Sequence, residues 1–196
     1  QVVSHIRYTQ HLAMVDDKFD SSDPTWYKDR WQLKFSNISG TDNRWGYAIF
    51  SDYTNKDGNP NENEIAINPL QREKRLTGGY SGLIEYGDSK ATEELNLGHK
   101  YNINDIDFSG CAIANDDGKK RIFFDNLGRP FTDNPELLVN THVDSSGKNL
   151  LLTGQCQIEL CDVIDCSTAT STQKVVISIE PETGYACILD SIGNCI

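Results

Sequence analysis

Long apolar runs are missing from this sequence of 196 residues. No stretch approaches the ~20 apolar residues of a membrane-spanning helix, and no signal-peptide pattern is found. Positive charge is also scarce, because 18 Lys and Arg face 29 Asp and Glu and give a net charge of −11. This acidic balance works against nonspecific binding to nucleic acid or anionic lipid. We therefore expect no nucleic-acid partner unless the one basic run, residues 119–121, clusters with Arg129.

Common catalytic motifs are absent as well. The sequence contains no P-loop and no G-x-G-x-x-G, and its four histidines form no HExxH or HxH pair. Residues 79–82, GYSG, fall one residue short of the G-x-S-x-G elbow. No local motif selects two of the many carboxylates as a glycosidase pair. We predict that the protein is not an enzyme. The alternative is a secreted β-sandwich protein that binds carbohydrate or acts on glycosides, with stacking platforms such as Trp26, Tyr27 and Trp45.

Cysteine, by contrast, is plentiful toward the C-terminus. The count of six is even, and the spacing fits neither a zinc ribbon nor a common iron–sulfur pattern. We therefore predict disulfides and an oxidising compartment, such as a bacterial periplasm or an extracellular space. Spacing leaves the pairing open, and we favour a small terminal loop closed by Cys187 and Cys195. The six residues are Cys111, Cys156, Cys161, Cys166, Cys187 and Cys195.

The loop at residues 52–64 is the best candidate for a metal site. Its first part, DYTNKDGN, places oxygen side chains at alternate positions before a glycine. A calcium loop needs this arrangement because Ca²⁺ takes roughly six to eight oxygen ligands. Tyr53, however, stands where an acid should be, and the alternative is an ordinary Asn/Asp/Gly turn. We expect no other cofactor. The candidate ligands are Asp52, Asn55, Asp57 and Glu62, with Glu64 as an alternative to Glu62.

The hydrophobic period changes after the first fifteen residues. Bulky side chains recur at helical spacing as far as Val15, and the acidic turn that follows is a plausible stop. Trp31, Leu33 and Phe35 then alternate with polar residues, as in a half-buried strand. Further strands are expected at 45–49, 65–67, 106–113, 121–125, 149–160, 174–180 and 185–189, with a short helix or an edge strand at 91–97.

These elements predict an α+β fold in one domain over residues 1–196. A helix within residues 1–19 would pack on the β-rich part, residues 28–196, which would form an antiparallel sheet or a two-layer sandwich. A lone helix of ~15 residues is marginal in water, so this helix must pack on a domain or continue a longer one. Because nothing before Gln1 caps it, we expect that further sequence precedes it.

Two motifs in the second half support a family assignment. Residues 121–130, RIFFDNLGRP, are a hydrophobic strand and a polar turn that ends in Gly-Arg-Pro. Residues 173–185, QKVVISIEPETGY, are a strand that ends in a Pro-x-Thr-Gly turn. In this order, behind an N-terminal helix, they resemble the FimT/GspH family, the minor pilins of type IV pili and the H-type minor pseudopilins of type II secretion. Tyr185 stands where the family often has a basic residue, and the cysteine-rich end is not a family-wide feature.

The resemblance implies a non-enzymatic subunit at or near the tip of a type IV pilus or pseudopilus. Its partners would be other minor pilins or pseudopilins. It would be anchored in the inner membrane of a Gram-negative bacterium with a periplasmic head, or lie in an extracellular filament. An apolar anchor and a cleaved, methylated prepilin N-terminus are then expected ahead of Gln1, and a DNA-uptake subunit or adhesin is the second interpretation. The expected assembly helix carries Val2, Val3, Ile6 and Leu12.

Overall fold

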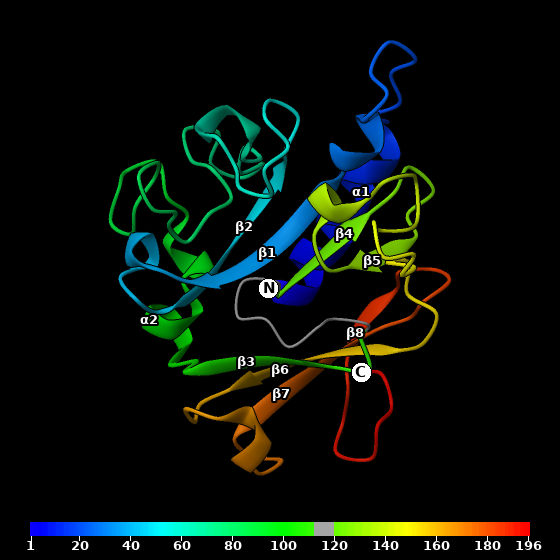
Figure 1. The fold of residues 1–196 in the computed structure, drawn as a ribbon. Helices are drawn as coiled ribbons and strands as arrows, with labels where there is room; N and C mark the ends of the chain where they lie inside the picture. The colour runs from blue at the N-terminus through cyan, green and yellow to red at the C-terminus, as the bar shows by residue number, and fades with distance from the viewer. Residues whose placement is uncertain (112–119) are drawn as a thin grey trace.

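A computed structural model describes residues 1–111 and 120–196 of the chain. Within these residues, one long N-terminal helix is followed by two antiparallel four-stranded sheets. The fold is therefore α+β and mostly sheet, which confirms the predicted class at this level. In Figure 1 the helix lies behind strands of the first sheet, and the second sheet crosses below it.

Helix α1, Val2–Val15, has the bounds that the spacing of its bulky residues predicts. Its buried positions are Val2, Ile6, Thr9 and Ala13, which recur every three or four residues and so share one face. The Asp16 backbone N–H donates to Leu12 O at 2.9 Å and closes the last turn. Because α1 packs against β1, β4 and β8, it contacts both sheets.

Neighbouring strands are antiparallel in both sheets. The first sheet has the order β2-β1-β4-β5, and the second has the order β3-β6-β7-β8. The first sheet comprises β1 (Trp31–Asn37), β2 (Trp45–Ser51), β4 (Arg121–Phe124) and β5 (Pro130–Thr132). The second comprises β3 (Asp105–Ser109), β6 (Cys156–Cys161), β7 (Lys174–Ile179) and β8 (Ala186–Ile188). A short helix, α2 (Leu97–Tyr101), leads into β3.

The main hydrophobic core lies between α1 and both sheets. Ile6 of α1, Leu33 of β1 and Ile158 of β6 are all fully buried in one cluster. The rings of Phe35 and Phe108 meet edge to face across the two sheets, with centroids 6.0 Å apart. Because α1 fills the angle between the sheets, it belongs to the core of this fold. Among the described residues, no helix combines the length and apolar character needed to cross a bilayer.

Several predicted elements differ in the structure. Residues 65–67 form isolated bridges rather than a strand, and of the predicted strand at 149–160 only β6 is formed. Residues 91–97, predicted as a short helix or an edge strand, do hold a short 3-10 helix, Glu93–Leu95, ahead of α2. Strand β5 begins at Pro130, and the proline is tolerated there because it is the first residue of an edge strand. The predicted strand at 106–113 ends at Ser109, and its residues 112 and 113 lie outside the described residues.

All six cysteines form disulfides, as predicted. The pairs are Cys111–Cys156, Cys161–Cys166 and Cys187–Cys195, so the terminal loop favoured from the sequence is confirmed. Three disulfides indicate an oxidising environment, such as the periplasm or the cell exterior.

Candidate functional site

Helix α1 is tied to both sheets by one amide side chain. Gln10 Nε2 donates to Gly128 O at 2.8 Å and to Thr183 O at 2.6 Å. Gly128 lies in the turn between β4 and β5, and Thr183 lies in the turn between β7 and β8. The two sequence motifs quoted above therefore end in turns that meet at the same residue of the helix.

Glycine is required on both sides of this junction. Gly128 and Gly184 have φ angles of 78° and 64°, in the left-handed region that favours glycine. A Cβ at Gly184 would lie 2.7 Å from Gly128 O and 2.5 Å from Gln10 Nε2. The close approach of the two turns therefore explains the glycine at 184, whereas the glycine at 128 follows from its positive φ and from the side chains of Gln10 and Met14 beside it.

A second polar contact fixes α1 to the last strand. Arg7 Nη2 donates to Ala186 O at 2.7 Å, and the guanidinium lies 4.9 Å from the centroid of the Tyr185 ring. Tyr185 lies just before β8, so this cation–π contact holds the helix beside the start of that strand.

The four residues of the expected assembly helix are divided between core and surface. Val2 and Ile6 are 7% and 0% exposed and belong to the main core, whereas Val3 and Leu12 are half-buried against it. The apolar face of α1 is therefore largely occupied by its own domain. Beside the first turn, however, an apolar groove of about 300 Å³ stays open. It is lined by residues of α1, of the segment around α2 and of the second sheet, including Val2, Val3, Tyr101, Leu160, Val175 and Ile188.

The carboxylates of the predicted calcium loop already have partners within the protein. The two oxygens of Asp52 accept the backbone N–H groups of Lys56 and Gly58 at 2.9 and 2.6 Å. Asp57 accepts from the Asn55 side chain at 2.8 Å, and Glu62 pairs with Lys90 at 2.6 Å. Glu64, the alternative ligand, is buried and accepts the backbone N–H groups of Thr54 and Asn61, both at 2.6 Å. Among the described residues, these acids do not bring three ligand atoms within 4.8 Å of one another.

The calcium hypothesis stays a prediction, and burial of Asp52 gives it a pH test. Burial raises the pKa of Asp52 to about 6, so a proton competes with any cation below that pH. If the loop binds calcium, calorimetry detects a saturable heat with millimolar calcium at about pH 7.5, weaker at about pH 5 and lost in Asp52→Asn. The absence of heat in the wild type would remove the hypothesis.

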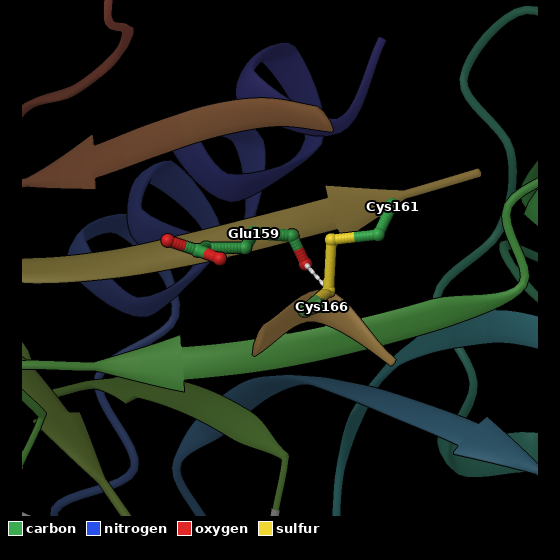
Figure 2. A group of neighbouring side chains, drawn as sticks. All are labelled: Glu159, Cys161 and Cys166. Carbon is green, nitrogen blue, oxygen red and sulfur yellow. Dashed lines mark hydrogen bonds between the residues drawn. A yellow bond between two sulfur atoms is a disulfide. The ribbon is translucent and has the colours of Figure 1, made fainter. Parts of the chain in front are cut away.

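One cluster among the described residues has metal-ligating geometry, and its chemistry excludes a thiolate site. Figure 2 shows Glu159, Cys161 and Cys166, whose ligand atoms lie within 4.8 Å of one another. The two sulfurs are joined in a disulfide, and a disulfide sulfur is not the thiolate that binds metals. The Glu159 carboxylate is paired with Lys174 at 2.9 Å. In the oxidised protein this cluster is therefore structural.

The outer face of the first sheet carries buried cations. Lys34 of β1 and Arg121 of β4 lie opposite each other in the strand register and are 8% and 3% exposed. Arg30, just before β1, is 5% exposed. Within the described residues, none of the three has a carboxylate within 4.0 Å. Two like charges facing each other on one sheet face destabilise the pairing, so this face calls for a functional explanation.

Lys34 lines a cavity at the outer face of the first sheet. Its Nζ donates to Asn59 Oδ1 at 2.8 Å, to the Tyr80 hydroxyl oxygen at 3.0 Å and to Gly58 O at 3.2 Å. The adjoining cavity measures about 460 Å³, and its wall includes Trp45. Burial, followed by the like charge of Arg121, lowers the pKa of Lys34 to about 7.

Sequence reasoning missed this site because it placed Lys34 on the open side of a half-buried strand. In the structure both faces of β1 are covered, and Gln32 beside it is fully buried. Phe50, Ile65 and Tyr80 form a second cluster on that face, so the long connection between β2 and β3 acts as a second cover. A lysine flanked by Leu33 and Phe35 offers no local signal of this burial.

The basic run considered for DNA binding does not gather in the described part of the chain. Arg121 is buried, and Lys120 donates to Ile106 O and lies 3.9 Å from Asp105. Arg129 pairs with Asp125 at 2.7 Å, and Lys119 lies outside the described residues. The aromatic residues proposed as sugar platforms also differ in role: the rings of Trp26 and Tyr27 meet edge to face, whereas Trp45 borders the Lys34 cavity.

No family model, curated protein or solved structure matches this chain. Three features of its geometry bear on function: the junction at Gln10, the apolar groove beside the first turn of α1 and the cavity at Lys34.

Proposed function

We propose that this chain is a non-enzymatic assembly subunit of the minor pilin or minor pseudopilin type. The observation that carries the proposal is the junction at Gln10, where the helix binds the terminal turns of both resemblance motifs. An N-terminal helix that is locked to two sheets forms one rigid head, which suits a subunit that must keep its shape within a filament. The three disulfides support the same proposal, because such a head works in an oxidising compartment.

The groove beside the first turn of α1 is the surface through which we expect this subunit to contact its partners. Its lining is almost entirely apolar, with Gln1 as the polar exception. Val175 and Ile188, on adjacent strands of the second sheet, are 45% and 38% exposed on its wall. An apolar groove continuous with a helix fits the apolar face of a neighbouring subunit's helix. The proposed partners are therefore sibling minor pilins or pseudopilins.

A charge placed in the groove tests this proposal. In Val175→Glu, binding of the full-length protein to its sibling subunits should fall at least tenfold, because the partner would have to desolvate a carboxylate. Co-purification from detergent-extracted membranes of cells that co-express the sibling genes measures the effect. Ile164→Glu is the matched control, since Ile164 is 90% exposed and does not line the groove. Equal recovery of siblings with Val175→Glu and Ile164→Glu would contradict the assignment of this surface.

The coding sequence upstream of Gln1 provides an independent test of the subunit type. A prepilin cleavage site followed by ~20 apolar residues would support the proposal. An upstream sequence without an apolar stretch would overturn it.

A further inference from the structure

One oxygen position beside Lys34 is held by two converging donors. Asn59 Oδ1 accepts a hydrogen bond from Lys34 Nζ at 2.8 Å and another from the Tyr80 hydroxyl at 2.7 Å. Lys34 comes from β1. Asn59 and Tyr80 both come from the long connection between β2 and β3. An oxygen that accepts from an ammonium and a phenol is in the position that a negatively charged oxygen would favour most.

Asn59 occupies this position with an exposed side chain. The residue is exposed, whereas Lys34 and Tyr80 are each 8% exposed. The Asn59 amide can rotate into solvent once another oxygen takes its place, whereas the two donors are held by the surrounding structure. Asn59 Oδ1, the Tyr80 hydroxyl oxygen and Gly58 O fill the three hydrogen bonds of the Lys34 ammonium, but all three acceptors are neutral, and no carboxylate of the described residues lies within 4.0 Å of this buried charge.

The oxygen position opens onto the cavity of about 460 Å³. This volume is within the range of ~300–1,000 Å³ typical of small-molecule sites. Ile38 and Trp45 provide apolar wall, and Asn37 provides an amide that can bind a hydroxyl. Lys120 lies 4.8 Å from the centroid of the Trp45 ring and adds positive charge nearby.

We propose that this cavity binds a small organic carboxylate, one oxygen of which replaces Asn59 Oδ1 between Lys34 Nζ and the Tyr80 hydroxyl. A single negative charge matches the single buried cation that lines the cavity. Arg121 does not line it, and its Nη1 is occupied by Gln32, Gly58 and Asn134 at 2.7 to 3.1 Å. The site shares no lining residue with the groove beside α1, so its test is independent of the proposed assembly function.

The carboxylate can belong to an acidic sugar or to a simpler aromatic acid. Both present a carboxylate beside a flat apolar surface, which Trp45 can contact. Glucuronate and benzoate are therefore the two probes, and glucose is the neutral control. Binding of glucuronate but not benzoate would identify the ligand as an acidic sugar. Binding of benzoate but not glucuronate would identify it as an aromatic acid.

Affinity should depend on pH through Lys34. The charged and titratable groups that face it are Arg121 across the strand pair, Tyr80, and Asp52 and Asp57 of the adjoining loop. Since the Lys34 pKa is about 7 without ligand, the binding-competent ammonium is mostly lost above that pH. The probes carry their charge throughout this range, so binding should be about tenfold weaker at pH 8 than at pH 6.

Isothermal calorimetry on the full chain with millimolar glucuronate or benzoate tests the proposal. We expect a saturable heat in the wild type and none in Lys34→Met. Asn59→Asp should also abolish binding, because its own carboxylate would fill the oxygen position, whereas Asn59→Ala should bind at least as tightly as the wild type. Asn59 is exposed, so this matched pair avoids the risk that a core substitution prevents folding.

Stability gives a second readout without ligand. Unfolded Lys34 keeps its proton up to about pH 10.5, whereas folded Lys34 releases it near pH 7, so wild-type stability should rise between these values. The rise should disappear in Lys34→Met. No heat with either probe in the wild type, equal binding in Lys34→Met, or equal binding in Asn59→Asp and Asn59→Ala would each overturn the proposal.

Discussion

Replacing Cys111 and Cys156 together by Ala is expected to lower the free energy of unfolding by about 4 kcal/mol. The reason is loop length, because this disulfide joins residues 45 apart and restricts the unfolded chain most. It also connects the end of β3 to the start of β6, where Cys156 is fully buried. A loss of this size is a large part of the ~5–15 kcal/mol that stabilises a typical domain.

The disulfide Cys187–Cys195 provides the control, since it closes a loop of residues only 8 apart. Its double Ala variant should lose about 2.5 kcal/mol. The buried cysteines of the two pairs, Cys156 and Cys187, are 0% and 1% exposed, so the packing lost at these two positions is similar. Equilibrium unfolding in urea, followed by circular dichroism, measures both variants. An equal loss, or a larger loss for Cys187 and Cys195, would contradict the loop-length argument.

Substitution Ile6→Ala should lower the free energy of unfolding by about 3 kcal/mol. Ile6 is 0% exposed and lies on the face of α1 that contacts both sheets, so the lost side chain leaves a cavity in the main core. The value is typical of substitutions that replace a large buried side chain by Ala. The stability lost in such variants combines the lost burial of apolar surface with the cost of the cavity that remains. Thermal and chemical unfolding of the same chain provide the measurement.

Val15→Ala is the matched control, because Val15 is in the same helix and is 64% exposed. Its effect should stay within about 0.5 kcal/mol. If Ile6→Ala were as mild as Val15→Ala, α1 would be a separable arm and the junction at Gln10 would have no structural role. The pair of variants therefore tests the part of the fold on which the proposed function depends.

Local patterns in the sequence predicted most of the secondary structure. The helical spacing that ends at Val15 gave α1 its bounds, and alternation over Trp31, Leu33 and Phe35 located β1. These predictions succeeded because side-chain direction follows the backbone period within a few residues. The prediction of a strand over residues 149–155 was wrong, because an apolar run does not specify whether a strand partner is present along its whole length.

The candidate sites were less accessible to sequence reasoning, because they depend on residues far apart in the chain. Glycines at 128 and 184 are visible as turn residues, but their meeting at Gln10 requires the packing of α1 between two sheets. Lys34 and Asn59 are separated by 25 residues and Tyr80 by a further 21. No periodicity connects them, so only the folded chain shows that two donors share one oxygen.

Local patterns in the sequence were enough to predict the N-terminal helix, the β-rich remainder and the use of cysteine for disulfides, and they favoured the pair Cys187–Cys195 without fixing the pairing. These features follow from local spacing and from the chemistry of one residue type. The tertiary structure alone decided that both faces of β1 are covered, and it thereby turned Lys34 from a surface lysine into a buried cation. The physical reason is that burial depends on which distant segment packs over a strand, and that choice is made by the whole chain.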